Sequence, residues 1–168
     1  MSDTNDHSLP TVRRIVTGHN EAIQAVIQRD GLIKARRAGH GPYITRLWAS
    51  DEVPPNANAI QDMGLVETGL SNSGTICRIV DFPPKSNGMV HRSMTLDYIY
   101  VVKGEVVLTL DDGSRTVVRE GEVVVQQATM HGWDNETEGW ARLLCILISA
   151  EPPVVEGQQL QAEVPFQI

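Results

Sequence analysis

The sequence is short of positive charge and has no long apolar run. Its 168 residues include 14 Lys and Arg against 21 Asp and Glu, a formal net charge of −7. Nucleic acids and anionic membranes need concentrated positive charge on a partner, so we expect neither to bind. No apolar run approaches membrane-spanning length, and the polar start MSDTNDHSLP lacks the apolar core of a signal peptide. We therefore expect a cytoplasmic protein.

Cysteine is also scarce. Cys77 and Cys145 are the only two, and each lies inside an apolar stretch, where a thiol behaves as a small hydrophobic group. Nothing in their placement indicates a disulfide framework or a zinc knuckle. Two cysteines without an expected disulfide are consistent with a reducing compartment.

Helical periodicity is missing as well. No segment carries apolar residues at helical spacing over three turns. Instead, runs rich in Val, Ile, Leu and Thr are interrupted by Gly104, Gly113 and Gly121 at intervals of roughly ten residues, which is typical of antiparallel hairpins. The pattern predicts an all-β antiparallel barrel or sandwich rather than a parallel array of strands and helices.

The chain length suits one domain. We expect a flexible arm over residues 1–10, strands and a loop packing on the barrel over 11–74, the barrel itself over 75–150, and a tail over 151–168. The final VPFQI is apolar enough to pack back on the body.

The N-terminal part favours a strand, a turn at Gly18 to Asn20 and a second strand; a helix from Glu21 to Arg29 is the alternative. Residues 43–49 predict a strand with Trp48 in the core, and the proline-rich segment after it predicts a loop over one mouth of the barrel. Three histidines in polar surroundings are expected at the surface: His7, His19 and His40.

The segment Trp140 to Ser149 is almost continuously apolar. Such a strand is either buried on both faces or covered by a partner chain. Since barrels of this kind can pair through their sheets, we expect a homodimer.

The chemistry is expected in residues 88–135. In a strand, His91, Ser93, Thr95 and Asp97 would share one face. If His131 faces the same interior, two imidazoles and a carboxylate converge, and these are the ligands of a 2-His-1-carboxylate site for a divalent metal such as Fe, Zn, Mn or Ni. Ser93 is a poor ligand, so the donor set is minimal.

Two other interpretations use the same residues. A histidine held by a carboxylate in a partly apolar interior can transfer protons near neutral pH. Alternatively, His131 is a core histidine with only a structural role. The residues expected to line the site are Met89, Ser93, Tyr98, Gln126 and Trp133.

The stretch resembles the two motifs of the cupin superfamily (RmlC-like). The first, G-x5-H-x-H-x3,4-E-x6-G, is matched at His91, with Asp97 in the Glu position and Gly104 closing it; the second is matched at Gly121, His131 and Asn135. HRSMTLDY and GEVVVQQATMHGWDN are more similar to a subgroup of small single-domain cupins that have H-R-S/T-x-S-L-D-Y and G-D-V-V-V-Q-R-G-T-x-H-x-W-x-N. In that subgroup Arg and Gly stand where this chain has Gln127 and Ala128.

The resemblance implies a cupin-type β-barrel (a jelly roll, or double-stranded β-helix) with added N-terminal strands. It also implies a small-molecule enzyme, and several reactions are open. We expect proton-transfer chemistry (decarboxylation, dehydration or isomerisation) in secondary metabolism; an Fe(II)-dependent dioxygenase and a non-catalytic binding barrel are the alternatives.

Overall fold

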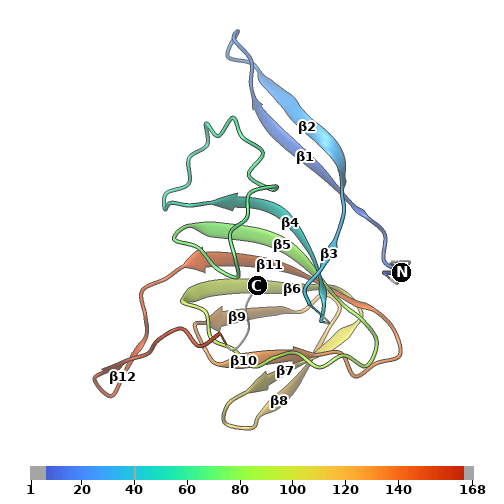
Figure 1. Cartoon of the computed structure of the whole chain (residues 1–168), viewed down its shortest axis with the longest axis vertical. Helices are drawn as coiled ribbons and strands as arrows, with labels where there is room; N and C mark the ends of the chain where they lie inside the picture. The colour runs from blue at the N-terminus through green and yellow to red at the C-terminus, as the bar shows by residue number, and fades with distance from the viewer. Residues whose placement is uncertain (1–6, 40, 165–168) are drawn as a thin grey trace.

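The computed structural model describes residues 7–39 and 41–164, and within these ranges every regular element is a β-strand. All strand pairs are antiparallel. Two sheets face each other as a barrel, and a long hairpin projects from it (Figure 1). The all-β prediction is therefore confirmed, and the described residues hold no helix that could cross a membrane.

The larger sheet has six strands in the order β3-β4-β5-β11-β6-β9. Their bounds are β3 Arg36–Arg37, β4 Tyr43–Ser50, β5 Thr75–Phe82, β6 Thr95–Lys103, β9 Val123–Gln127 and β11 Ala141–Ser149. The apolar β11 lies in the middle of this sheet, between β5 and β6. The smaller sheet has the order β10-β7-β8, with β7 Glu105–Leu110, β8 Arg115–Arg119 and β10 His131–Asp134.

The core lies between the two sheets. Alternate residues of β5, β6 and β11 point into it, as the two-residue period of a strand requires. Its members include Ile76, Val80, Ile99, Val101, Val106, Leu143, Cys145, Leu147 and Trp133. Val101 of β6 and Val106 of β7 are both completely buried, so strands of both sheets contribute to one apolar interior.

The N-terminal segment forms the predicted hairpin and not the alternative helix. β1 (Val12–His19) pairs with β2 (Ala25–Ile33), and Asn20 stabilises the turn by accepting hydrogen bonds from the backbone of Ala22 and Gln24. A second short hairpin, β12 (Val154–Val155) with β13 (Gln158–Gln159), follows the barrel. The predicted packing of VPFQI concerns residues mostly outside the described ranges.

His7 is not a surface histidine, which corrects the expectation. Its side chain is only 8% exposed, its Nε2 lies 2.7 Å from Asp81 Oδ2, and its ring stacks on Tyr43. Leu9 is also buried. Residues 7–10 thus pack on the outer face of β5, while residues 1–6 and His40 lie outside the described ranges. His19 is exposed, as predicted.

One further expectation differs from the structure: Trp48 is half-buried outside the core, with the Arg14 guanidinium 5.8 Å from its ring centroid. Of the two alternatives for β11, burial on both faces does not hold within one chain, because Ile146 on its outer face is 36% exposed. Cover by a partner chain stays a prediction. The outer faces of β6, β9 and β11 together form a surface that we call the outer apolar face: Tyr98, Tyr100, Val123, Val125 and Ile146.

Candidate functional site

The two predicted histidines are direct neighbours. His91 and His131 form an antiparallel bridge in which each backbone N–H donates to the other residue's carbonyl, at 2.9 and 3.0 Å. This pairing puts both side chains on one face of the bridge. Their ring centroids are 4.4 Å apart with the planes tilted by 56°. The two imidazoles therefore face one interior, although 40 residues separate them in the chain.

Backbone carbonyls fix the tautomer of each ring. His91 Nδ1 lies 3.0 Å from the Met89 carbonyl, and His131 Nδ1 lies 2.9 Å from the Thr129 carbonyl. A carbonyl oxygen only accepts hydrogen bonds, so Nδ1 carries the proton in both neutral rings. Nε2 is then the basic nitrogen of each ring.

Gln126 joins the third predicted residue to this pair. It lies directly opposite Asp97 in the β6–β9 register. Its amide Nε2 donates to Asp97 Oδ2 at 2.7 Å and lies 3.1 Å from His131 Nε2, which accepts. Asp97 Oδ1 and Gln126 Oε1 are buried without a hydrogen-bond partner. The sequence placed Gln126 at the site but not between the carboxylate and the imidazole.

Burial favours the neutral form of all three titratable groups. The pKa of His131 is lowered to about 4, mainly by burial; the hydrogen bond to the Thr129 carbonyl opposes this shift, and the neighbouring His91 and Arg78 contribute to it. The pKa of His91 is lowered mainly by burial. Burial raises the pKa of Asp97, while Thr95, Arg78 and Gln126 act in the opposite direction. The site is a set of neutral imidazoles beside a carboxyl group that is easier to protonate than usual.

Some of the residues predicted to line the site are buried in the interior, and others are exposed on the outside of the barrel. Ser93 is buried and its hydroxyl lies 2.8 Å from that of Thr95, and Trp133 is buried in the core. Tyr98 was expected at the site, but it is 41% exposed on the outer apolar face because it alternates with the inward Asp97. The Met89 side chain is 55% exposed, so this residue contributes its carbonyl.

The predicted three-ligand metal set is not assembled in this arrangement. Among the residues that the structure describes, no group of three or more His, Cys, Asp or Glu side chains could hold a metal ion. The Gln126 amide separates Asp97 from His131, and its N–H takes the Nε2 lone pair that a metal would need. The donors as placed therefore do not fit a 2-His-1-carboxylate centre.

Sequence reasoning missed two arginines that belong to this interior. Arg78 on β5 and Arg46 on β4 are direct cross-strand neighbours, and Arg78 also lies opposite Cys145 of the core. The available signal was a charged residue within TICRIV, on the same strand face as Ile76 and Val80.

Comparison with known proteins agrees with the fold and the motif positions. The family model for the cupin domain matches residues 78–147. The chain is 32% identical to the cupin-domain-containing oxidoreductase virC of Hypocrea virens over 154 residues, which cover 86% of this chain and 79% of that protein. The chain belongs to the cupin family. A second relative, the oryzines biosynthesis cluster protein J of Aspergillus oryzae, is 38% identical over 95% of both chains.

A solved structure shares this cupin fold. The polyketide cyclase RemF from Streptomyces resistomycificus superposes with a TM-score of 0.52 at 17% identity, over 81% of this chain and 82% of that one. At this identity the likeness concerns the fold alone.

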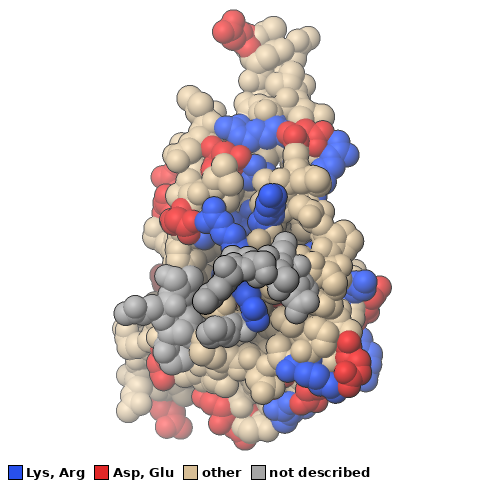
Figure 2. Space-filling view, turned by 45° about the vertical axis from the view of Figure 1, so that its right-hand side comes forward, with Lys and Arg blue, Asp and Glu red and all other residues tan. Residues whose placement is uncertain are grey.

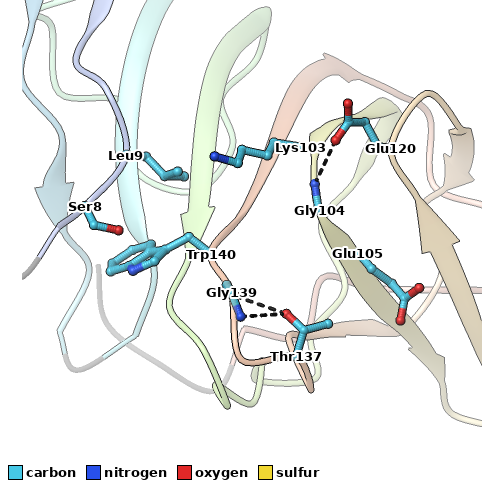
Figure 3. A pocket seen from close by; sticks show the side chains of 9 residues that line it. All are labelled: Ser8, Leu9, Lys103, Gly104, Glu105, Glu120, Thr137, Gly139 and Trp140. Atoms are coloured by element: carbon cyan, nitrogen blue, oxygen red, sulfur yellow. Dashed lines mark hydrogen bonds between the residues drawn. The ribbon is translucent and has the colours of Figure 1, made fainter.

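A pocket of about 600 Å³ opens at a different part of the cupin barrel (Figure 3). It is lined by Ser8, Leu9, Lys103, Gly104, Glu105, Glu120, Thr137, Gly139 and Trp140. None of the predicted site residues lines it, and it holds no histidine. Its polar groups are partly used locally, since Glu120 accepts a hydrogen bond from the Gly104 N–H. We do not assign the cupin chemistry to this pocket.

The depressed pKa of His131 predicts that acid destabilises the fold. Because the folded pKa of about 4 lies below the ordinary histidine pKa of 6.5, the unfolded chain binds more protons between these pH values, and stability falls as pH drops through this window. His131 alone accounts for about 3 kcal/mol of that loss. His91 acts in the same direction, and Asp97 in the opposite one.

Urea unfolding of the native chain and of His131→Asn at pH 7 and pH 4 measures this effect. The native chain should lose more stability than the variant between the two pH values. Equal losses in both chains would show that His131 titrates normally.

Proposed function

We propose that this cupin is a small-molecule enzyme that transfers protons to and from a carbonyl compound, in an isomerisation, dehydration or decarboxylation. The observation that carries the proposal is the pair of imidazoles with fixed tautomers. Both Nδ1 atoms donate to backbone carbonyls, so Nε2 is the basic nitrogen of each ring, and burial lowers the pKa of both imidazoles and so favours their neutral form at physiological pH. A neutral imidazole with a basic Nε2 is what general-base chemistry requires, and of the two rings it is His131 whose Nε2 already accepts a hydrogen bond from Gln126.

The three polar side chains have different tasks in this mechanism. His91 is half-buried and more accessible than His131, which is 4% exposed, so His91 takes the substrate proton at Nε2. His131 is held by Gln126 and positions its neighbour through the 4.4 Å ring contact. His91 returns this proton to the substrate in the closing step, and Asp97 accepts a hydrogen bond from Gln126 and so holds its amide beside His131 Nε2.

A metal-dependent oxidoreductase is the second candidate. The observation in its favour is the similarity to virC of Hypocrea virens, a cupin-domain-containing oxidoreductase. It would require Gln126 to leave His131 Nε2, since the donors as placed do not fit the three-ligand centre. The name of the Aspergillus oryzae relative places that protein in a biosynthesis cluster, which supports a role in secondary metabolism under either candidate.

Deuterium exchange distinguishes the candidates. The chain, treated with a strong chelator and kept free of oxygen, is incubated in D₂O with a panel of β-keto and β-hydroxy acids, and exchange or conversion is followed by NMR. We expect catalysed exchange that falls at least about a hundredfold in His91→Asn. His19→Asn, which changes an exposed histidine of the hairpin, is the matched control and should keep full activity.

Two results would contradict the proposal. Activity that appears only with added Fe, Mn, Zn or Ni, and with oxygen consumption, would establish the oxidoreductase. Binding of panel compounds without exchange or conversion would instead indicate a non-catalytic barrel.

We also propose that two chains pair through the outer apolar face. The side chains there alternate with the inward residues of β6, β9 and β11, and none of its members carries a charge. Val125→Lys should therefore give a monomer in sedimentation velocity at micromolar concentration, while Val117→Lys, on the smaller sheet, should sediment as the native dimer. A native chain that sediments as a monomer would refute the pairing.

A further inference from the structure

Two arginine side chains point into the barrel from neighbouring strands. Arg78 shares the inner face of β5 with Ile76 and Val80, which are core residues. Arg46 is its direct partner in the β4–β5 register, and Cys145 of β11 is its partner on the other side. Strands lie about 4.8 Å apart, so a long arginine side chain on β5 reaches across β11 toward the inner face of β6, which carries Asp97.

Placing two positive charges side by side in the barrel lowers the stability of the fold unless an anion compensates them. Like charges directly opposite each other on neighbouring strands destabilise a sheet, and a buried charge needs a partner. Arg46 donates a hydrogen bond to the Val66 carbonyl, but its only carboxylate neighbour among the described residues is Glu67 at 3.6 Å, whose side chain is 75% exposed. No ion pair within 4.0 Å joins Arg78 to a carboxylate of the described residues, Asp97 included.

The hydrogen-bonding capacity of Arg78 is largely unused. A guanidinium has five N–H donors. Arg78 donates through Nη1 to the Leu70 carbonyl at 3.4 Å, a long hydrogen bond, and its Nε is buried with no partner. A buried donor without a partner in a native protein requires an explanation, and an unbound ligand is one.

The neighbouring arginines differ in having carboxylate partners, although the Nε of Arg14 is also buried without a hydrogen-bond partner. Arg14 donates to Asp62, Arg36 donates to Glu67, and Arg13 is paired with Asp30. Figure 2 shows basic and acidic side chains interleaved on the face below the hairpin tip. The segment of residues 51–74 supplies the carboxylates of Asp62 and Glu67 for Arg14 and Arg36, but it offers Arg78 only the Leu70 carbonyl oxygen.

We propose that Arg46 and Arg78 form a binding site for the carboxylate of a small organic acid, on the interior face of the barrel that also carries Asp97. A planar carboxylate accepts two parallel hydrogen bonds from one guanidinium, and Nε with one Nη is a suitable donor pair. The buried Nε of Arg78 supplies the first of these bonds. Arg46 adds a second positive charge. An anionic ligand would compensate this charge, whereas a neutral ligand would not.

The inference rests on the proposed function in one respect: the acid held there is the compound whose proton His91 moves. Arg78 lowers the pKa of both imidazoles, so its charge acts at their position. A carboxylate on Arg78 would offset this effect and raise the basicity of the rings. Binding of the acid would thereby prepare the base that acts on it.

A titration with benzoate tests the site without requiring turnover. The ¹⁵N-labelled chain is titrated with benzoate, and in parallel with inorganic phosphate, while the arginine Nε–Hε and histidine Cε1–H signals are recorded. We expect saturation at one benzoate per chain, a shift of the Arg78 Nε–Hε signal, and a rise in the pKa of His131. Phosphate that binds more tightly than benzoate would overturn the assignment to carboxylates.

Variants identify the residues that bind. Arg78→Gln should weaken benzoate binding at least tenfold, and Arg46→Gln and Arg78→Lys should weaken it less. Arg13→Gln, on the exposed hairpin, should bind as the native chain does. Unchanged affinity in the folded Arg46→Gln and Arg78→Lys chains, or no saturable binding by the native chain, would overturn the proposal even if Arg78→Gln fails to fold.

The outcome is separable from that of the proposed function. His91→Asn should still bind benzoate while losing exchange activity. If that variant and the native chain bind benzoate equally but neither exchanges protons, the carboxylate site stands and the proton-transfer mechanism fails.

Discussion

Replacing Asn135 with leucine is expected to lower the free energy of unfolding by about 3–5 kcal/mol. Asn135 is completely buried. Its Nδ2 donates to the carbonyls of Phe82, Pro83 and Gly139, and its Oδ1 accepts from the backbone and hydroxyl of Thr137. Leucine has a similar size but makes none of these hydrogen bonds, and the groups among them that are buried, such as the Phe82 carbonyl, then carry a desolvation cost.

Urea unfolding at pH 7 measures the loss, with Asn58→Leu as the control because Asn58 is exposed in the 51–74 segment. The control should change stability by less than about 0.5 kcal/mol. A loss below about 1 kcal/mol in Asn135→Leu would mean that water or a shifted loop satisfies the same carbonyls. The result would also give a physical role to the last residue of the second cupin motif, which closes the turn between β10 and β11 and does not touch the imidazoles.

Arg142→Met is expected to cost about 3–5 kcal/mol, because it leaves a buried carboxylate without its main partner. Asp81 is completely buried on the outer side of β5. Arg142 donates to both of its oxygens, at 2.6 and 2.7 Å, and also to the Pro10 carbonyl at 3.0 Å. The variant keeps the length of the side chain but leaves only His7 to bind Asp81. Thermal and urea unfolding should both report the loss.

The double variant Asp81→Leu/Arg142→Met separates the charge from the packing. Removing both partners removes the uncompensated charge, so the double variant should be more stable than Arg142→Met alone. A double variant that is less stable by the full sum of the two single losses would show that the residues act independently. Arg142→Lys should lie between the native chain and Arg142→Met, since lysine cannot bind both oxygens at once.

The sequence predicted the fold and the histidine pair because both follow from short-range patterns. Strand alternation placed His91 and Asp97 on one face, and glycine-punctuated hairpins brought the strand of His131 back to it. The cupin motifs pointed to the same residues. Alternation also explains the error at Tyr98, which is adjacent to Asp97 and therefore faces outward.

The features of the site that the sequence did not predict depend on the register between strands that are distant in the chain. Gln126 interposes between Asp97 and His131 only because the β6–β9 register places it opposite Asp97, and no local pattern gives that register. Arg78 and Arg46 come from strands far outside the motif region, and their pairing depends on a β-bulge in β4 between Arg46 and Trp48. The three-ligand metal hypothesis assumed that shared facing implies contact, which the Gln126 amide prevents.

Both faces of β6 carry residues with a defined environment, and this limits the insertions and deletions that the strand can accept. One strand presents Asp97 and Ile99 to the interior and Tyr98 and Tyr100 to the outer apolar face. Inserting or deleting one residue in it would exchange the two sets, because the side-chain period is two. We therefore expect natural homologues to differ in length at the turns and in the 51–74 segment while β6 keeps a constant number of residues. Lineages that change the substrate would do so by substitution on one face of this strand, leaving the other face under separate selection.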